Sequence, residues 1–160
     1  MILLDCTVLS NFAAVHRPAF IAQAFFEDIS TTDAVFDELK TGVRLRRIPE
    51  CDWSWLKKIQ LTLSEQHQLQ QLRRQLGGGE ASCLAVASQR NWKIATDDRD
   101  ARQWAVRLRI PYTGTLGVLT ALVKQNRITL TEGNEWLRWM MQAGYHSPVT
   151  ELDDLVHSRR

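Results

Sequence analysis

Short apolar runs alternate with amphipathic stretches along most of this chain. Residues 2–4 are an apolar run that ends at Asp5, and we interpret them as a buried strand. Over residues 7–14 the apolar positions recur at a spacing of about 3.6 residues, which predicts a helix. The alternation continues to about residue 143. It predicts an α/β fold with a mostly parallel sheet.

The same pattern places further strands and helices. Strands are expected at residues 29–31, 93–96 and 110–113. Helices are expected at residues 20–27, 34–40, 64–76, 80–89, 100–108, 116–124 and 131–143.

Some boundaries and one long segment are less regular. Thr32 or Asp33 is a candidate cap for the helix over 34–40, and Gly42 is its expected stop. Thr131 is the expected cap of the last helix. Residues 51–56 alternate apolar and polar positions, which fits a strand, but they fit an irregular connection equally well.

The length and composition favour one ordinary domain. The 160 residues are 44% hydrophobic and 24% charged, as is typical of soluble globular proteins. We expect a single domain over residues 1–145 and a C-terminal tail over 146–160. The longest apolar runs are far short of the roughly 20 residues of a membrane span, and residues 2–4 lack the features of a signal peptide, so no membrane association is expected.

The cysteines bear on the compartment and on one candidate nucleophile. Three widely spaced cysteines do not suggest a disulfide framework, and no paired spacing typical of zinc sites is present. A reducing cytoplasm is therefore the expected location. Cys6 stands beside Asp5, but a buried small hydrophobe explains it more simply than a nucleophile does.

Acidic residues stand near the ends of apolar runs that are far apart in the chain. They are Asp5, Glu38, Glu80, Asp97 and Asp98. Because the carboxyl ends of parallel strands meet at one edge of a sheet, Asp5 and the Asp97–Asp98 pair are expected near each other. Gathered carboxylates are hard oxygen ligands, which suit Mg²⁺ or Mn²⁺.

Each acid also has a simpler explanation when it is taken alone. An aspartate after a strand often caps the next helix, and Glu80 begins a helix whose dipole favours a carboxylate. Angular position on the helix over 34–40 does not separate Glu38 from Asp37. Gly77–Gly79 lack the Lys-Ser/Thr of a phosphate loop, so we interpret them as a segment that permits close backbone approach.

The charge pattern is compatible with a nucleic-acid substrate without establishing one. The formal net charge is only +2. Arginines cluster at 44–47 and again just after the Asp97–Asp98 pair, where Arg99 and Arg102 are candidate nucleic-acid contacts. Solvated helix faces explain the same arginines equally well.

Four segments, in order along the chain, resemble motifs of the PIN-domain family. They are Asp5-Cys6-Thr7-Val8-Leu9-Ser10-Asn11-Phe12, Ala34-Val35-Phe36-Asp37-Glu38-Leu39, Gly79-Glu80-Ala81-Ser82-Cys83-Leu84-Ala85-Val86-Ala87 and Ala95-Thr96-Asp97-Asp98-Arg99-Asp100-Ala101-Arg102. A fifth segment, residues 113–119, resembles one subgroup of that family. Each motif is weak alone, but their order over residues 1–125 is specific.

This resemblance implies a parallel-sheet α/β/α sandwich and a metal-dependent ribonuclease, often the toxin of a toxin–antitoxin pair. It implies an acidic quartet, a supporting pair and a set of partners. The quartet would be Asp5, Glu38, Glu80 and Asp98, with Asp97 as an additional or alternative metal ligand. Asn11 and Thr96 would support it. The implied cofactor is Mg²⁺ or Mn²⁺, and the implied partners are an RNA substrate, an antitoxin and a second copy of the chain.

Two features depart from the family pattern, and two other functions stay open. The third acid is Glu80, where many relatives carry aspartate, and the doubled Asp97–Asp98 leaves the fourth ligand ambiguous. Phosphotransfer on Asp5 and a non-catalytic binding module are the alternatives. The four histidines fall outside all the motifs and are expected to be surface or incidental residues.

Overall fold

A single parallel sheet forms the centre of the protein in the computed structural model, which describes residues 1–158. The five strands lie in the order β3-β2-β1-β4-β5, and every neighbouring pair is parallel. The strands are β1 (Ile2–Leu4), β2 (Ile29–Thr32), β3 (Lys57–Ile59), β4 (Lys93–Ala95) and β5 (Tyr112–Thr113). The predicted parallel α/β fold is confirmed.

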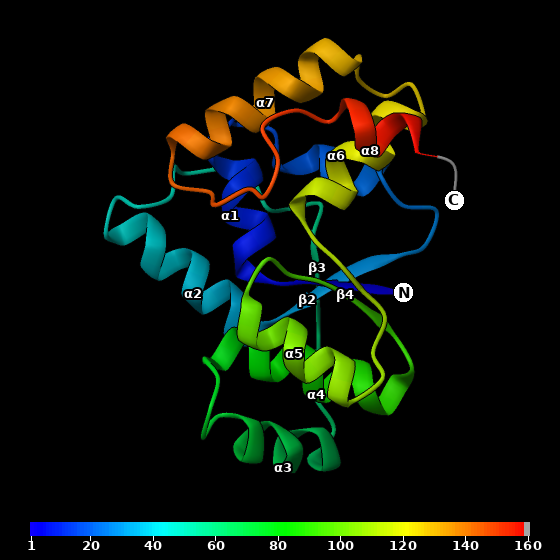
Figure 1. Cartoon of the computed structure of the whole chain (residues 1–160). Coiled ribbons are helices and arrows are strands. Elements are labelled where there is room, and N and C mark those ends of the chain that lie inside the picture. The colour runs from blue at the N-terminus through cyan, green and yellow to red at the C-terminus, as the bar shows by residue number, and fades with distance from the viewer. Residues whose placement is uncertain (159–160) are drawn as a thin grey trace.

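Helices cover both faces of this sheet. They are α1 (Cys6–Ala14), the 3₁₀ helix η1 (Pro18–Gln23), α2 (Asp33–Arg44), α3 (Leu63–Leu72), α4 (Gly78–Arg90), α5 (Arg99–Arg107), α6 (Thr115–Lys124), α7 (Leu130–Gln142) and α8 (Asp153–His157). Figure 1 shows α1, α6, α7 and α8 on one face and α3, α4 and α5 on the other, which makes an α/β/α sandwich. None of the helices over residues 1–158 is both long and apolar enough to cross a membrane.

The order of the strands creates a crevice beside β1. The chain adds β2 and β3 on one side of β1 and β4 and β5 on the other, so the direction of strand addition reverses between β1 and β4. Leu4 at the end of β1 lies opposite Ala95 at the end of β4. Parallel α/β sheets bind ligands beyond the carboxyl ends of their strands at such a point. Asp5 and Thr96 are the residues that follow these two strands.

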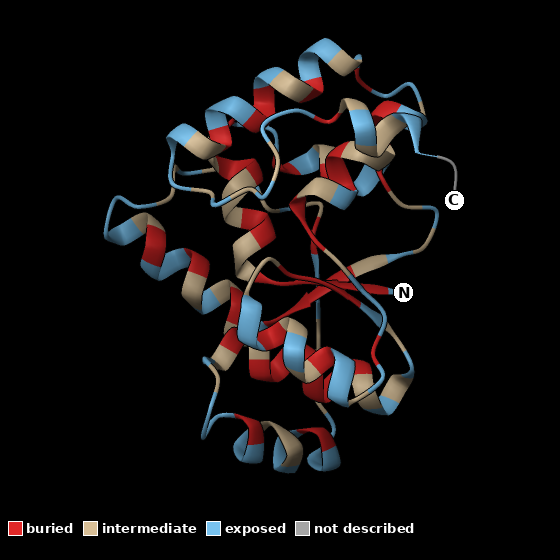
Figure 2. Cartoon of the chain, in the orientation of Figure 1, coloured by how far each residue is buried: buried red, intermediate tan, exposed pale blue. Residues whose placement is uncertain are grey.

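The core lies on both faces of the two central strands. Leu3, Leu4 and Ala95 are fully buried, as expected for strands that are covered on both sides. The small side chains of α4 are buried from Ala81 to Ala87, so this helix packs closely on the sheet. Figure 2 shows the buried residues concentrated on the strands and on α4. The rigid core thus fixes the strand ends from which the acidic residues project.

Three local expectations were wrong for identifiable physical reasons. The helix expected at 20–27 is instead a 3₁₀ helix that begins at Pro18, and the Ala24 N–H donates to the Ile21 carbonyl. Gly42 does not end α2. It is buried within that helix, and an added Cβ would lie 2.4 Å from Cδ1 of Ile48, so glycine lets the Ile48 side chain pack closely against the helix.

The third wrong expectation concerns the cap of α7. Thr129, not Thr131, caps this helix in a reciprocal capping box with Glu132. The open alternative at residues 51–56 resolves as an irregular connection, because the Asp52 carboxylate accepts hydrogen bonds from the backbone N–H and hydroxyl of Ser54. The strand β3 follows this turn.

Residues 146–158, which the sequence pattern leaves as a tail, pack back onto the domain. Leu152 is fully buried, and its N–H donates to Oδ1 of Asn134 on α7 at 2.7 Å. Helix α8 follows directly. Residues 159 and 160 of the expected tail lie outside the described residues.

Candidate active site

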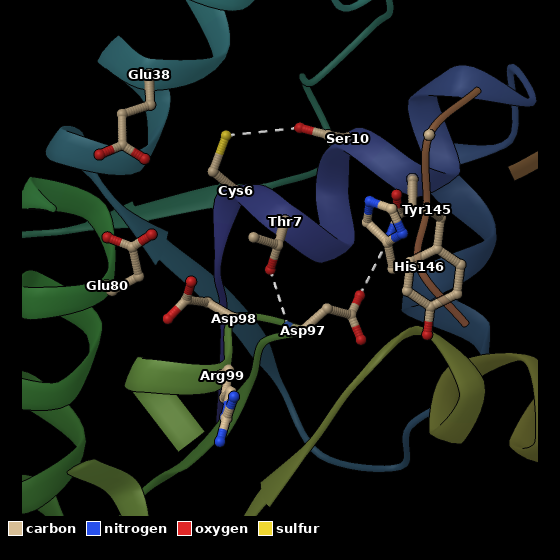
Figure 3. Close-up of a pocket in the computed structure, with 12 residues that line it drawn as sticks. Cys6, Thr7, Ser10, Glu38, Glu80, Asp97, Asp98, Arg99, Tyr145 and His146 are labelled. Carbon is tan, nitrogen blue, oxygen red and sulfur yellow. Dashed lines mark hydrogen bonds between the residues drawn. The ribbon is translucent and has the colours of Figure 1, made fainter. Parts of the chain in front are cut away.

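A cavity of about 480 Å³ opens at the carboxyl ends of β1 and β4. Side chains from α1, α2, α4, the β4–α5 turn and the segment after α7 line it (Figure 3). The acidic lining residues are Glu38, Glu80, Asp97 and Asp98. The fold therefore brings together at one cavity acids that are up to 60 positions apart in the sequence, from 38 to 98.

Asp5 lies beneath this cavity, and its side chain is held on both oxygens. The residue is 1% exposed. Its Oδ1 accepts the Cys6 N–H at 2.7 Å, while Oδ2 accepts the hydroxyls of Thr7 at 2.9 Å and Thr96 at 2.7 Å. Burial raises the pKa of Asp5 to about 6, although these hydrogen bonds act in the opposite direction.

Two threonine hydroxyls join the end of β1 to the end of β4. Thr7 Oγ1 accepts the backbone N–H of Asp97 at 2.9 Å, and Thr96 Oγ1 accepts that of Asp98 at 3.2 Å. Each hydroxyl also donates to Asp5. Thr96 thus lies where a supporting residue was expected, whereas Thr7 was missed although it stands within the first motif.

The structure distinguishes Glu38 from Asp37. The Glu38 side chain faces the cavity, and its Oε1 accepts the Gly79 N–H at 2.8 Å. The Asp37 side chain is 76% exposed and lies 3.9 Å from Lys40 on the outer face of α2. An added Cβ on Gly79 would lie only 2.4 Å from Oε2 of Glu38, so the glycine run does permit a close approach.

Glu80 has the least satisfied carboxylate of the cluster. It stands in the first turn of α4, and its Oε2 is buried with no hydrogen-bond partner within residues 1–158. Burial raises the pKa of Glu80 to about 7, and the negative charges of Asp5, Glu38 and Asp98 raise it further. A buried oxygen without a partner is costly, so this atom is suited to a cation.

Asp97 and Asp98 have different surroundings. The Asp97 side chain is 9% exposed and accepts hydrogen bonds from Asn11 Nδ2 at 3.0 Å, from Arg102 at 3.0 Å, and from the backbone N–H and hydroxyl of Thr115. Asp98 uses one oxygen to cap α5, where Oδ1 accepts the Ala101 N–H at 2.7 Å. Figure 3 shows its carboxylate pointing toward Glu80.

The two candidate arginines also differ. The Arg102 guanidinium donates to the Thr96 carbonyl at 2.9 Å and to Asp97, and it lies 5.8 Å from the ring centroid of Tyr112. The Arg102 guanidinium is therefore already hydrogen-bonded within the protein. Arg99 is exposed at the edge of the cavity.

The donor set fits a hard divalent cation, although its atoms are not yet arranged around one. Within residues 1–158, no three Asp, Glu, His or Cys side chains are already placed to hold a single metal ion. Burial, and to a smaller extent the neighbouring carboxylates, raise the pKa values of Asp5 and Glu80, and Oε2 of Glu80 has no hydrogen-bond partner within residues 1–158. A bound cation would favour the charged form of both groups. Glu38, Glu80 and Asp98 line the same cavity, so they are the acids that could hold such a cation there.

The sequence pattern missed two lining residues, Tyr145 and His146. His146 was expected to be a surface or incidental residue; it is exposed, and it also lines the cavity. Tyr145 is half-buried beside Asp97, and burial together with that carboxylate raises the pKa of the phenol. Both follow Gly144, whose φ of 113° redirects the chain after α7. A glycine just after α7 was the available signal for this turn.

Comparison with known proteins agrees with the fold and with the family resemblance of the sequence. A family model described as a PIN domain matches residues 1–158. Comparison with curated proteins and with solved structures gives no match. The family match extends beyond residue 125, so it includes α7 and the segment that places Tyr145 and His146. From this match and the parallel α/β/α architecture, we conclude that the chain belongs to the PIN-domain family, which has a nuclease-type fold.

Proposed function

We propose that this protein is a Mg²⁺- or Mn²⁺-dependent endoribonuclease that uses Asp5, Glu38, Glu80 and Asp98. The observation that supports this most strongly is the buried, unpartnered Oε2 of Glu80 among other carboxylates. Carboxylates that are crowded in this way are stabilised by a divalent cation. The family match supports a nuclease, and the choice of RNA and of the metal is our proposal.

The residues of the cluster have separate roles in this proposal. Glu38, Glu80 and Asp98 would hold the metal at the cavity, and Asp5 would hold it from beneath. When bound, the ion would supply Lewis-acid activation of water and charge neutralisation at the scissile phosphate. Because the pKa of Glu80 is about 7, its carboxyl can carry a proton that is released when a cation binds.

Asp97 is better suited to positioning than to metal binding. Its charge is already paired with the Arg102 guanidinium, and it also accepts hydrogen bonds from Asn11 and Thr115, whereas the donors to Asp5 are all uncharged. We therefore propose Asp98 as the fourth acid and assign Asp97, Asn11 and Thr96 to holding the site together. Arg99 remains our candidate phosphate contact, and Arg102 does not, because its guanidinium is engaged.

The toxin assignment and its partners rest on the family resemblance. We propose that the protein acts in the cytoplasm as the toxin of a toxin–antitoxin pair and assembles as a homo-oligomer. A small DNA-binding reading frame beside the gene, whose product suppresses cleavage, would support this. A purified chain that remains monomeric would contradict the homo-oligomer. A neighbouring gene product without effect on cleavage would contradict the toxin–antitoxin pair.

The nuclease proposal is tested with circular single-stranded RNA, which has no ends for an exonuclease. Wild-type protein is expected to linearise it with Mg²⁺ or Mn²⁺ and not with EDTA. The Asp5→Asn variant should lose cleavage and keep a native circular dichroism spectrum. The matched control is Asp37→Asn, because Asp37 is exposed outside the cavity. Full activity of Asp5→Asn, or cleavage in EDTA, would overturn the proposal.

A non-catalytic binding module is the second candidate, because no three ligating side chains over residues 1–158 are already arranged around one ion. In that case RNA would bind without being cleaved in either metal. Phosphotransfer is not proposed. Both Asp5 oxygens accept hydrogen bonds and the side chain is buried, so it is poorly placed to attack a phosphoryl donor.

A further inference from the structure

The segment after α7 is fixed in place where it meets the cavity. We call residues 144–152 the C-terminal strap. Its first turn is a Schellman motif, in which the Gly144 N–H donates to the Met141 carbonyl at 3.1 Å and the Tyr145 N–H donates to the Met140 carbonyl at 2.9 Å. Gly144 has the positive φ that this motif needs. Tyr145 and His146 therefore leave the helix in a defined direction.

The far end of the strap is also anchored. The N–H of Leu152 donates to Oδ1 of Asn134, and Nδ2 of Asn134 donates to the Asp153 carboxylate at 2.9 Å. Leu152 itself is fully buried. A single asparagine on α7 thus holds the end of the strap, and both anchors belong to the folded domain.

The strap forms a wall of the cavity that differs in chemistry from the other walls. Figure 3 shows Tyr145 and His146 across the cavity from Glu38 and Glu80. Among the described residues that line the cavity, these two alone carry aromatic rings. Tyr145 is half-buried against Asp97, whereas His146 is exposed. The His146 ring is thus the aromatic surface that a ligand can reach.

A single-stranded RNA would make two kinds of contact at such a site. Its phosphate would lie at the acidic residues, whose charge the proposed cation neutralises, and its bases would stack on flat surfaces. The acidic wall offers no such surface. A base next to the scissile phosphate would meet the strap on the opposite side.

We propose that His146 is a substrate-contacting residue that stacks against a nucleobase next to the scissile phosphate. This inference rests on the proposed ribonuclease function. It adds a base contact, built from the C-terminal strap, to the acidic cluster.

The test measures RNA binding separately from cleavage, by fluorescence anisotropy of a short labelled single-stranded RNA with Ca²⁺ in place of Mg²⁺. His146→Ala should raise Kd by about tenfold, within the range expected for loss of one stacked base. His146→Phe retains a stacking ring and should restore Kd to within about threefold of wild type. In cleavage assays, the effect of His146→Ala should fall more on KM than on kcat.

The matched control is His67→Ala, because His67 is an exposed histidine on α3, outside the cavity. It should bind RNA as wild type does. Wild-type affinity in His146→Ala, or equal weakness in His146→Phe and His146→Ala, would overturn the stacking role even if the protein cleaves RNA. Weaker binding by His146→Ala in a protein that never cleaves would uphold the contact and overturn the nuclease proposal. No RNA binding by wild type would overturn both.

Discussion

Acidic residues that are adjacent in the sequence have different structural roles, because tertiary contacts, not sequence spacing, determine where each side chain points. Asp97 accepts hydrogen bonds from α1, α5 and the start of α6, so it joins three elements. Asp98 caps α5 with one oxygen and turns toward Glu80. Glu38 and Asp37 differ in the same way, one facing the cavity and the other facing solvent.

The two aspartates should respond differently to the same change. Asp97→Asn is expected to lower the free energy of unfolding by about 1–3 kcal/mol, because an amide NH₂ would face donors that need an acceptor. Asp98→Asn should change it by less than about 0.5 kcal/mol, since asparagine caps a helix as well as aspartate does. Its RNA cleavage should nevertheless fall on the order of 10²-fold.

Urea denaturation and initial cleavage rates of the two variants, purified in parallel, check this pair of expectations. The reverse pattern, with Asp98→Asn unstable and Asp97→Asn stable but inactive, would make Asp97 the fourth acid instead.

Single residues were predictable only where backbone position alone determines their place. Asp5 follows a buried strand and Glu80 begins a helix, and both positions could be inferred from hydrophobic pattern. The choices between Asp37 and Glu38 and between Asp97 and Asp98 could not. His146 lay beyond the motifs, and only the turn at Gly144 brings it to the cavity.

Among the secondary-structure elements, the first turn of α4 contributes most directly to the geometry of the site. Gly79 donates its N–H to Glu38 and leaves no room for a side chain beside that carboxylate. Glu80 follows in the same turn. The helix therefore contributes both a ligand and the surface against which the α2 carboxylate rests.

Two alanine substitutions in this turn form a matched pair. In Gly79→Ala the new Cβ would lie 2.4 Å from Oε2 of Glu38, so the carboxylate must move, and cleavage should fall about 10- to 100-fold. In Gly78→Ala the nearest Glu38 atom would be 3.9 Å away, an ordinary contact. That variant should keep its activity and gain about 0.5–1 kcal/mol of stability from the alanine.

Cleavage rates and thermal denaturation of both alanine variants distinguish the outcomes. Equal activity in Gly78→Ala and Gly79→Ala would show that the position of Glu38 does not matter for the reaction.

Periodicity predicted the elements that pack a regular face and failed where local hydrogen bonds decide the backbone. Helices α4 and α6 and strands β1 and β4 lie close to their expected positions. The Asx turn at Asp52 and the capping box at Thr129 depend on side-chain hydrogen bonds that hydrophobic pattern does not report. For Thr129, the Thr-x-x-Glu spacing was a usable signal.

At the scale of the whole molecule, the sheet topology creates the site. The reversal between β1 and β4 leaves a crevice at their carboxyl ends, and helices from both faces contribute acids to it. The parallel sheet was predictable from the alternation of strands and helices. The strand order and the return of residues 144–158 were not, because they depend on contacts between distant segments.

The buried and closely spaced carboxyl groups of the site should make stability depend on pH and on metal. The pKa values of Asp5 and Glu80 are raised, from 3.8 to about 6 and from 4.5 to about 7. Between about pH 4 and 7 the folded protein therefore binds more protons than the unfolded chain. The stabilising contribution of these two groups is fully present below about pH 4 and is lost as pH rises toward 7.

Thermal denaturation at pH 5 and pH 8, with and without Mg²⁺, checks this expectation. Mg²⁺ should raise Tm more at pH 8 than at pH 5. At a hundredfold excess of free Mg²⁺ over Kd, binding stabilises the folded state by about 2.7 kcal/mol. Glu80→Gln should abolish that rise. An equal Mg²⁺ effect at both pH values would contradict the assigned protonation.

We propose that the carboxylates around Glu80 form a metal site that cleaves RNA. The decisive measurement is the cleavage rate of circular RNA by wild type and by Glu80→Gln in Mg²⁺, with the two proteins purified identically. Wild type is expected to linearise the RNA only with Mg²⁺, and the variant to lose activity on the order of 10²-fold. Equal rates for the two proteins would show that Glu80 does not hold the catalytic metal.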